Sequence, residues 1–186
     1  GCGAPLLVDD EVASLKSAAF ASLSRFGAPG TNLSLPLEVA KDIERRAGRL
    51  EERPVSTKVS VDGSWRLLYS NAPEISTLSS LPLGFALGPV YQPFATSRRA
   101  FENQAFVFHV LDLANATVRV VGDFRPLNET RFAVDFRRVV FSFERKSSPL
   151  FTKVLSPTVN PRAAIQITYI DSDLRVTRGA DGSLFV

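Results

Sequence analysis

Few side chains in this chain of 186 residues could perform acid–base or nucleophilic chemistry. Cys2 is the only cysteine, which excludes an intramolecular disulfide and a zinc site built from several cysteines. A Ser–His–Asp triad would have to use His109, the only histidine, and a histidine in a strand pattern is more often packed than catalytic. The sequence also lacks the Gly-x-Ser-x-Gly turn of hydrolases and the glycine-rich loops that bind phosphates or dinucleotides. We therefore expect neither enzymatic activity nor a metal site.

Two carboxylates, Asp171 and Asp173, remain as candidates for a paired acid–base site. They flank Ser172 between two segments of alternating apolar residues, where short polar side chains bond the nearby backbone. We interpret both as turn-forming residues. A second reversal follows at residues 179–182, where glycines can adopt positive φ, so residues 165–186 predict a three-stranded meander.

The composition is that of a globular protein, with 45% hydrophobic residues, 22% charged residues and a net charge of +3. The basic residues form no stripe of the kind that binds nucleic acid, so we expect no nucleic-acid partner. The sequence contains no run of about 18 apolar residues, so we expect no membrane-spanning helix. It begins at Gly1 without a recognisable signal or transit segment, so we expect it to be a mature, already processed form.

The period of the apolar residues divides the chain into a helical part and a strand part. We expect a flexible tail at residues 1–8 and a single domain over 9–186, which begins with two helices within 9–53. From residue 58 the period becomes two, and short segments at regular spacing over 58–186 predict roughly eight antiparallel strands. This pattern favours a barrel or a sandwich, with the helices packed on it.

Three places interrupt the alternation. The apolar parity switches near Arg137 and Arg138, which predicts a β-bulge or a strand break. Residues 71–89 are apolar but do not alternate, and they predict a loop that either folds onto the core or forms a flap at a pocket mouth or membrane surface. Residues 147–162 are rich in proline and serine and predict a long connection.

A barrel of about eight strands either encloses one small apolar ligand or is filled by its own side chains, and composition does not choose between the two. Strand parity nevertheless indicates which side chains face the interior. The side chains expected to face inward and to contact an apolar ligand are Trp65, Leu67, Tyr69, Tyr91, Phe106, Phe108, Phe141 and Phe143.

Three segments resemble sequence blocks of the plastid lipid-associated proteins, also called fibrillins or plastoglobulins. They are residues 62–70 (Asp-Gly-Ser-Trp-Arg-Leu-Leu-Tyr-Ser), residues 87–92 followed by 101–103, and residues 169–185, which are the most specific. That family is similar to lipocalins, and Gly63-x-Trp65 resembles the lipocalin Gly-x-Trp at the closed end of a barrel. The resemblance implies a mainly β fold with N-terminal helices (α+β), built around a lipocalin-like antiparallel β-barrel.

The resemblance also implies a function without catalysis. Members of the family are plastid (chloroplast) proteins at thylakoids and plastoglobules that bind or shelter carotenoids, quinones or other lipids. Photosynthetic membrane proteins are possible partners, and the alternative function is that of a structural subunit or assembly factor of a photosynthetic membrane complex. The motif residues that carry over are Gly63, Asp171, Arg175 and Arg178. By strand parity, Arg178 is expected to lie on Trp65 as a cation–π contact that locks the barrel rather than binds a ligand.

Overall fold

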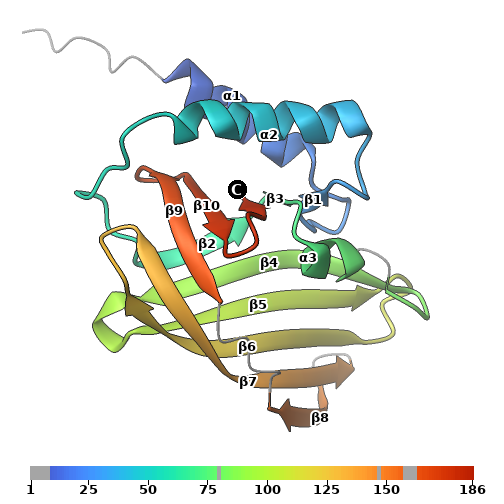
Figure 1. The fold of residues 1–186 in the computed structure, drawn as a ribbon. Coiled ribbons are helices and arrows are strands. Elements are labelled where there is room, and N and C mark those ends of the chain that lie inside the picture. The colour runs from blue at the N-terminus through green and yellow to red at the C-terminus, as the bar shows by residue number, and fades with distance from the viewer. Residues whose placement is uncertain (1–8, 79–80, 146–147, 157–162) are drawn as a thin grey trace, which may run out of the picture.

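The computed structural model describes residues 9–78, 81–145, 148–156 and 163–186 (Figure 1). The predicted tail at residues 1–8 lies outside them. The elements follow in chain order: α1 Asp10–Ala21, β1 Gly30–Thr31, α2 Leu37–Glu51, β2 Gly63–Leu67, β3 Tyr69–Ser70, α3 Pro73–Leu78, β4 Phe85–Ala95, the 3₁₀ turn Thr96–Arg98, β5 Ala100–His109, β6 Asn115–Pro126, β7 Arg131–Arg145, β8 Ser148–Leu155, β9 Ala164–Ile170, β10 Arg175–Gly179 and β11 Leu184–Phe185.

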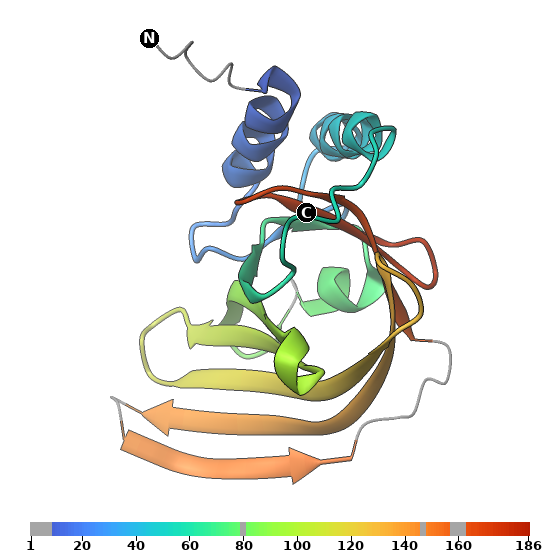
Figure 2. The ribbon, with the colours of Figure 1, turned by 90° about the vertical axis from the view of Figure 1, so that its left-hand side faces the viewer.

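The strands form one curled sheet in the order β1-β3-β11-β10-β9-β7-β6-β5-β4-β2, with β8 attached to β7. All described pairs are antiparallel except the two-residue pair β1–β3. Strands β2 and β3 lie near opposite ends of this order and are joined through Leu68. The ring is therefore completed at this point by the covalent chain and not by hydrogen bonds between two strands (Figure 2). The mainly β, lipocalin-like antiparallel architecture with N-terminal helices is confirmed, as a barrel that hydrogen bonds do not fully close.

Strand β7 carries the predicted bulge. Val121 of β6 pairs with Arg138 and Gly122 pairs with Phe136, which leaves Arg137 as the extra residue. On one side of the bulge, residues 131–133 pair with β9, whereas residues 139–145 on the other side pair with β8. The sheet therefore forks at β7, because its two halves have different neighbours.

Two expected loops contain regular structure. The long connection predicted over residues 147–162 is wrong for residues 148–155, which form the edge strand β8, and residues 157–162 lie outside the described part. The loop predicted over residues 71–89 contains α3 and the start of β4. Figures 1 and 2 together place α3 at the end of the barrel where β5 ends.

Helices α1 and α2 lie over the C-terminal strands (Figure 1). Asp9 caps α1, since its side chain accepts from the backbone N–H groups of Glu11 and Val12 at 3.2 and 3.4 Å. None of the helices in the described ranges is long and apolar enough to cross a bilayer. Helices α1 and α2 and the chain in and next to β3, β10 and β11 share one buried cluster: Leu15, Ala19, Ala40, Ile43, Ala47, Leu50, Leu68, Tyr69, Leu174, Val176, Leu184 and Val186.

Tyr69 belongs to this helix-side cluster, so the prediction that it faces the barrel interior is wrong. Its side chain is fully buried, and its hydroxyl donates to Glu44 of α2 at 2.8 Å. Burial and the neighbouring Glu44 carboxylate raise the pKa of Tyr69 above its usual value. The physical reason is the break at Leu68, which ends β2 and lets β3 turn both Leu68 and Tyr69 toward the helices.

Arg178 also points to the helices and not to Trp65. It shares strand parity with Leu174 and Val176 as expected, but that face packs against α1 and α2. Its guanidinium donates to both carboxylate oxygens of Glu51, with Nε–Oε1 at 2.8 Å and Nη2–Oε2 at 2.6 Å. Burial alone would raise the pKa of Glu51, but hydrogen bonds from Arg178 and Thr168 and the charge of Arg178 hold it below its usual value. The pair therefore fastens the end of α2 to β10.

We expect Arg178→Ala to lower the free energy of unfolding by about 1–3 kcal/mol, because it leaves a largely buried carboxylate unpaired. Arg178→Lys should restore only part of this, since lysine cannot make the two-pronged contact. Glu51 has a lowered pKa when folded, so its contribution is present above the pKa of an unfolded glutamate and is lost as the pH falls through the folded value. The stability difference between the parent and Glu51→Gln should thus shrink below about pH 4.

Urea unfolding of the parent, the three single variants and the double variant Arg178→Ala, Glu51→Gln at neutral and acidic pH measures these effects. In the double variant, the loss should be smaller than the sum of the single losses. Additive losses would show that the two side chains do not interact.

Candidate ligand site inside the barrel

One end of the barrel interior is filled by phenylalanine rings. Phe94, Phe101, Phe124 and Phe132 are all no more than 6% exposed. The centroids of the Phe94 and Phe124 rings are 4.4 Å apart, and Phe132 contacts Phe124 edge-on at 5.3 Å. No space for a ligand is left among rings that pack this closely.

Phe106 and Phe108 lie on the outer face of β5, so the prediction that they face inward is wrong. The inner residues of this strand are Phe101, Ala105 and Val107, which belong to the interior clusters. Both parities of β5 are apolar near its end, so alternation alone could not select the inner face.

Tyr91 also faces outward, which corrects its predicted place in the interior. Its ring meets that of Phe106 edge-on at 6.1 Å. Phe108 lies on the backbone of β4 at Gly88, where an added Cβ would be 2.2 Å from the Phe108 ring. The three aromatic side chains therefore form an outer cluster on β4 and β5.

Beyond the filled end, the inner face is apolar but incompletely covered. The ladder places Val118 opposite Phe141, Val120 opposite Val139, and Ala116 opposite Phe143. Phe143 packs in an interior cluster with Leu87, Val90 and Val107, so Phe141 and Phe143 face inward as predicted. Yet Val118, Val120, Val139, Phe141 and Phe143 are only half-buried. These inward-facing apolar side chains are therefore left partly uncovered by the protein's own side chains.

Trp65 and Leu67 pack in the interior clusters, as predicted. The Trp65 indole N–H donates to the carbonyl of Val61 at 2.8 Å, which fixes the ring. The strand that carries it begins at Gly63, whose φ of +134° is rarely accessible to residues with a Cβ. This backbone requirement gives a physical reason for glycine in the Gly-x-Trp pattern.

The cation on the Trp65 ring is Arg175, not Arg178. The centre of the Arg175 guanidinium lies 4.9 Å from the ring centroid. Its Nη2 donates to Gln92 Oε1 at 2.5 Å, and Gln92 Nε2 donates to Asn103 Oδ1 at 2.8 Å. Arg175, Gln92 and Asn103, which we call the interior polar chain, thus cross the barrel from β10 to β4 and β5.

Arg175 has no carboxylate partner among the residues that the structure describes. Burial lowers its pKa to about 9, which still leaves the guanidinium charged at neutral pH. Protein atoms surround the side chain, yet part of its surface remains accessible. Arg175 is thus a charged group that is largely enclosed on the inner side of the sheet and still has accessible surface.

Sequence reasoning missed Gln92 and Asn103. A usable signal was present, because Gln92 shares the parity of Val90 and Phe94. Asn103 likewise shares the parity of Phe101 and Val107. A polar side chain on an otherwise apolar parity indicates an interior hydrogen-bonding role.

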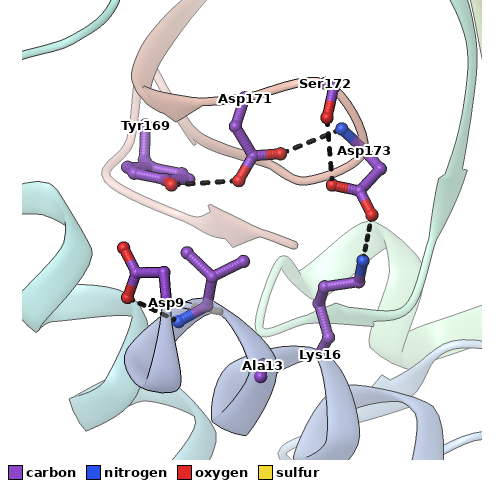
Figure 3. Close-up of a pocket in the computed structure, with 8 residues that line it drawn as sticks. Asp9, Ala13, Lys16, Tyr169, Asp171, Ser172 and Asp173 are labelled. Carbon is purple, nitrogen blue, oxygen red and sulfur yellow. Dashed lines mark hydrogen bonds and ion pairs between the residues drawn. The ribbon is translucent and has the colours of Figure 1, made fainter. Parts of the chain in front are cut away.

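Figure 3 shows a second hollow, an open crevice of about 510 Å³ between α1 and the turn that joins β9 to β10. Its lining includes Asp9, Lys16, Tyr169, Asp171 and Asp173. Asp171 Oδ1 accepts from the backbone N–H of Asp173 at 2.9 Å, and Asp173 forms an ion pair with Lys16. The interpretation of both aspartates as turn-forming residues is confirmed.

The remaining charges of the crevice are also engaged. Asp9 pairs with Arg53, and the Tyr169 hydroxyl donates to Asp171 Oδ2 at 3.0 Å. Burial and then Asp171 raise the pKa of Tyr169 to about 12. In the described residues, no three His, Cys, Asp or Glu side chains come together as a metal site requires. The crevice is therefore a seam between α1 and the sheet, and the interior is the better candidate site.

An apolar tip lies at the end of the barrel where β5 and β6 meet. Leu83, Val110, Leu111 and Leu113, which define this tip, are 84%, 45%, 71% and 53% exposed. The Val110 N–H donates to the carbonyl of Gly84 at 2.8 Å, so the two loops are held side by side. The His109 ring meets Phe85 edge-on at 5.1 Å next to the tip.

Comparison with known proteins agrees with this architecture. The family model described as PAP_fibrillin matches residues 36–186, from the start of α2 to β11. The chain belongs to the PAP/fibrillin family. The match to this fibrillin-family chain includes Trp65 and the whole interior polar chain, whereas α1 lies outside it.

A relative of this fibrillin-family chain is plastid-lipid-associated protein 6, chloroplastic, of Arabidopsis thaliana. The two are 28% identical over 170 residues, which cover 79% of this chain and 58% of the relative. The chain thus spans a little more than half the length of that protein. No solved structure matches this fibrillin-family chain significantly.

The contrast between the filled end and the open part predicts different costs for the same substitution. We expect Phe101→Ala, at 2% exposure, to lower the free energy of unfolding by about 3–5 kcal/mol. Phe141→Ala removes a half-buried ring that borders open space, so it should cost less than about 2 kcal/mol. Denaturant unfolding of the two variants measures both values, and equal losses would mean that the interior is filled throughout.

Proposed function

We propose that this fibrillin-family protein is a non-enzymatic plastid protein that shelters an apolar small molecule inside its barrel. Carotenoids, quinones and other lipids are the candidate ligands, and the proposed place of action is the surface of a thylakoid or plastoglobule. The observation that carries the proposal is the half-buried inner surface formed by Val118, Val120, Val139, Phe141 and Phe143. The chloroplastic designation of the relative supports the plastid location.

The energetics of the inner face favour an apolar ligand. Apolar surface that is removed from water contributes about 25 cal/mol per Å², so covering several half-buried valine and phenylalanine side chains stabilises a complex appreciably. The phenylalanines at the filled end provide a rigid wall, which limits what the protein loses in entropy on binding.

The apolar tip supports contact with a lipid surface. Leu83 and Leu111 are the most exposed of its side chains, and exposed leucines that cluster in this way are typical of interaction surfaces. The tip lies at the same end of the barrel as α3, so a ligand could pass between a lipid surface and the interior near this end (Figure 1).

The edge strand β8 favours a second candidate function, that of a structural subunit or assembly factor of a photosynthetic membrane complex. Leu150, Phe151 and Val154 are 54%, 55% and 60% exposed on β8. An exposed edge with apolar side chains is a suitable place for another protein to add a strand. Native purification separates the two functions, because copurified lipid or pigment supports the first and a stoichiometric protein partner supports the second.

Val139 and Val140 provide a matched test of the interior site. Both are half-buried on β7, but Val139 faces Val120 on the inner surface and Val140 pairs with Arg119 on the outer face. We expect Val139→Phe to fill part of the open space and weaken binding of Nile red, a neutral fluorescent probe, by about tenfold, equivalent to 1.4 kcal/mol. Val140→Phe should bind the probe like the parent.

Fluorescence titration of folded samples, checked by thermal unfolding, measures this difference. No saturable binding to the parent would leave the filled-barrel alternative standing. Equal weakening by both variants would place the probe somewhere other than the interior.

The apolar tip predicts a separate effect on vesicle binding. The double variant Leu83→Ser, Leu111→Ser should bind phosphatidylcholine vesicles at least about tenfold more weakly, since inserting one leucine contributes about 1.5–3 kcal/mol. Leu127→Ser is the control, because Leu127 is 47% exposed in the turn between β6 and β7 at the opposite end of the barrel. Vesicle cosedimentation is the measurement, and a tip variant that sediments like the control would contradict a membrane role for the tip.

A further inference from the structure

The interior polar chain has hydrogen-bonding capacity that the described part of the protein does not use. Of the Arg175 nitrogens, only Nη2 has a partner there, and the amide nitrogen of Asn103 has none. A guanidinium that protein atoms largely enclose is costly when no carboxylate offsets its charge. A group that supplies negatively charged oxygen atoms would satisfy both side chains.

We propose that Arg175 and Asn103 form the head-group site for an amphipathic lipid that has an anionic oxygen head, a carboxylate or a phosphate, on a hydrocarbon chain. The site rests on the proposed function and specifies the class of ligand that the interior takes. A hydrocarbon carotenoid offers no acceptor to these donors, and a quinone carbonyl offers an acceptor without the charge that offsets a guanidinium. Guanidinium groups bind carboxylates and phosphates through paired, charge-assisted hydrogen bonds.

The ladder leads directly from this head-group site to the open apolar surface. Asn103 pairs with Val120, and Val120 pairs with Val139 on β7. The next inward row contains Val118 and Phe141. A chain whose head lies at Arg175 therefore has continuous apolar contacts along β6 and β7.

The positions of the cation and the aromatic ring favour a fixed head group. Trp65 stacks on the guanidinium at 4.9 Å, and Gln92 holds Nη2, so the orientation of Arg175 is set before a ligand arrives. A donor that is already oriented loses little entropy when it binds, which increases the selectivity for a charged head over a neutral one.

The experiment is displacement of Nile red from the full chain at neutral pH, below the micelle concentration of each lipid. Oleate and oleyl phosphate should displace the probe at concentrations at least about tenfold lower than methyl oleate and oleyl alcohol. Whichever of the two charged lipids competes better identifies the head as carboxylate or phosphate. In Arg175→Gln the preference for charged lipids should fall to about twofold or less.

Arg137→Gln is the matched control, because it removes one positive charge from an exposed side chain of the bulge in β7 and should keep the full preference. If Arg175→Gln does not fold, Asn103→Leu, which removes the second donor, should reduce the preference in its place. Equal competition by charged and neutral lipids in the parent would overturn the head-group site and leave the proposed function intact. Failure of the parent to bind Nile red at all would overturn both.

Discussion

The charge of Arg175 inside an otherwise apolar barrel is the constraint on which the rest of the interior depends. A guanidinium keeps its proton, so its burial must be offset by contacts. The Trp65 ring and the Gln92 amide supply two of them, and they require β2 and β4 to lie where they do opposite β10. The glycine at position 63 is tied to the same requirement, since its positive φ starts the strand that carries Trp65.

The strand that carries Arg175 serves two parts of the protein with its two faces. Arg175 points into the barrel, whereas Val176 and Arg178 point to the helices, where Arg178 meets Glu51. Both arginines anchor the C-terminal meander, but to different partners. This arrangement explains why two arginines three residues apart have different environments, one with a carboxylate and one without.

The sequence predicted the elements better than it predicted which face of each strand is buried. Phe141 and Phe143 were assigned correctly because Ser142 and Glu144 make the alternation clear. Phe106 was misassigned, although Glu102 shares its parity farther along the strand and marks that face as the outer one. Tyr69 lost the parity of Trp65 and Leu67 at the break at Leu68. Arg178 had the expected parity, but the side of the sheet that the helices cover is a tertiary property. A local pattern carries no information about that side.

The incomplete burial of the inner rows of β6 and β7 is possible because other parts of the protein supply the stability. The helix-side cluster and the phenylalanine end are both closely packed, and together they hold the sheet in its curl. The rows of Val118 and Val120 between β5 and β7 are then free to stay half-exposed without loss of the fold. Larger side chains there would add buried apolar area and hence stability, but they would occupy the space next to Arg175. The fork at β7 has the same effect, because β8 continues the sheet away from β9 and does not close it over the polar chain. The accessible apolar face and the cation without a carboxylate partner in the described residues thus both leave stability unrealised, and the amphipathic ligand that we propose would cover the first and pair with the second.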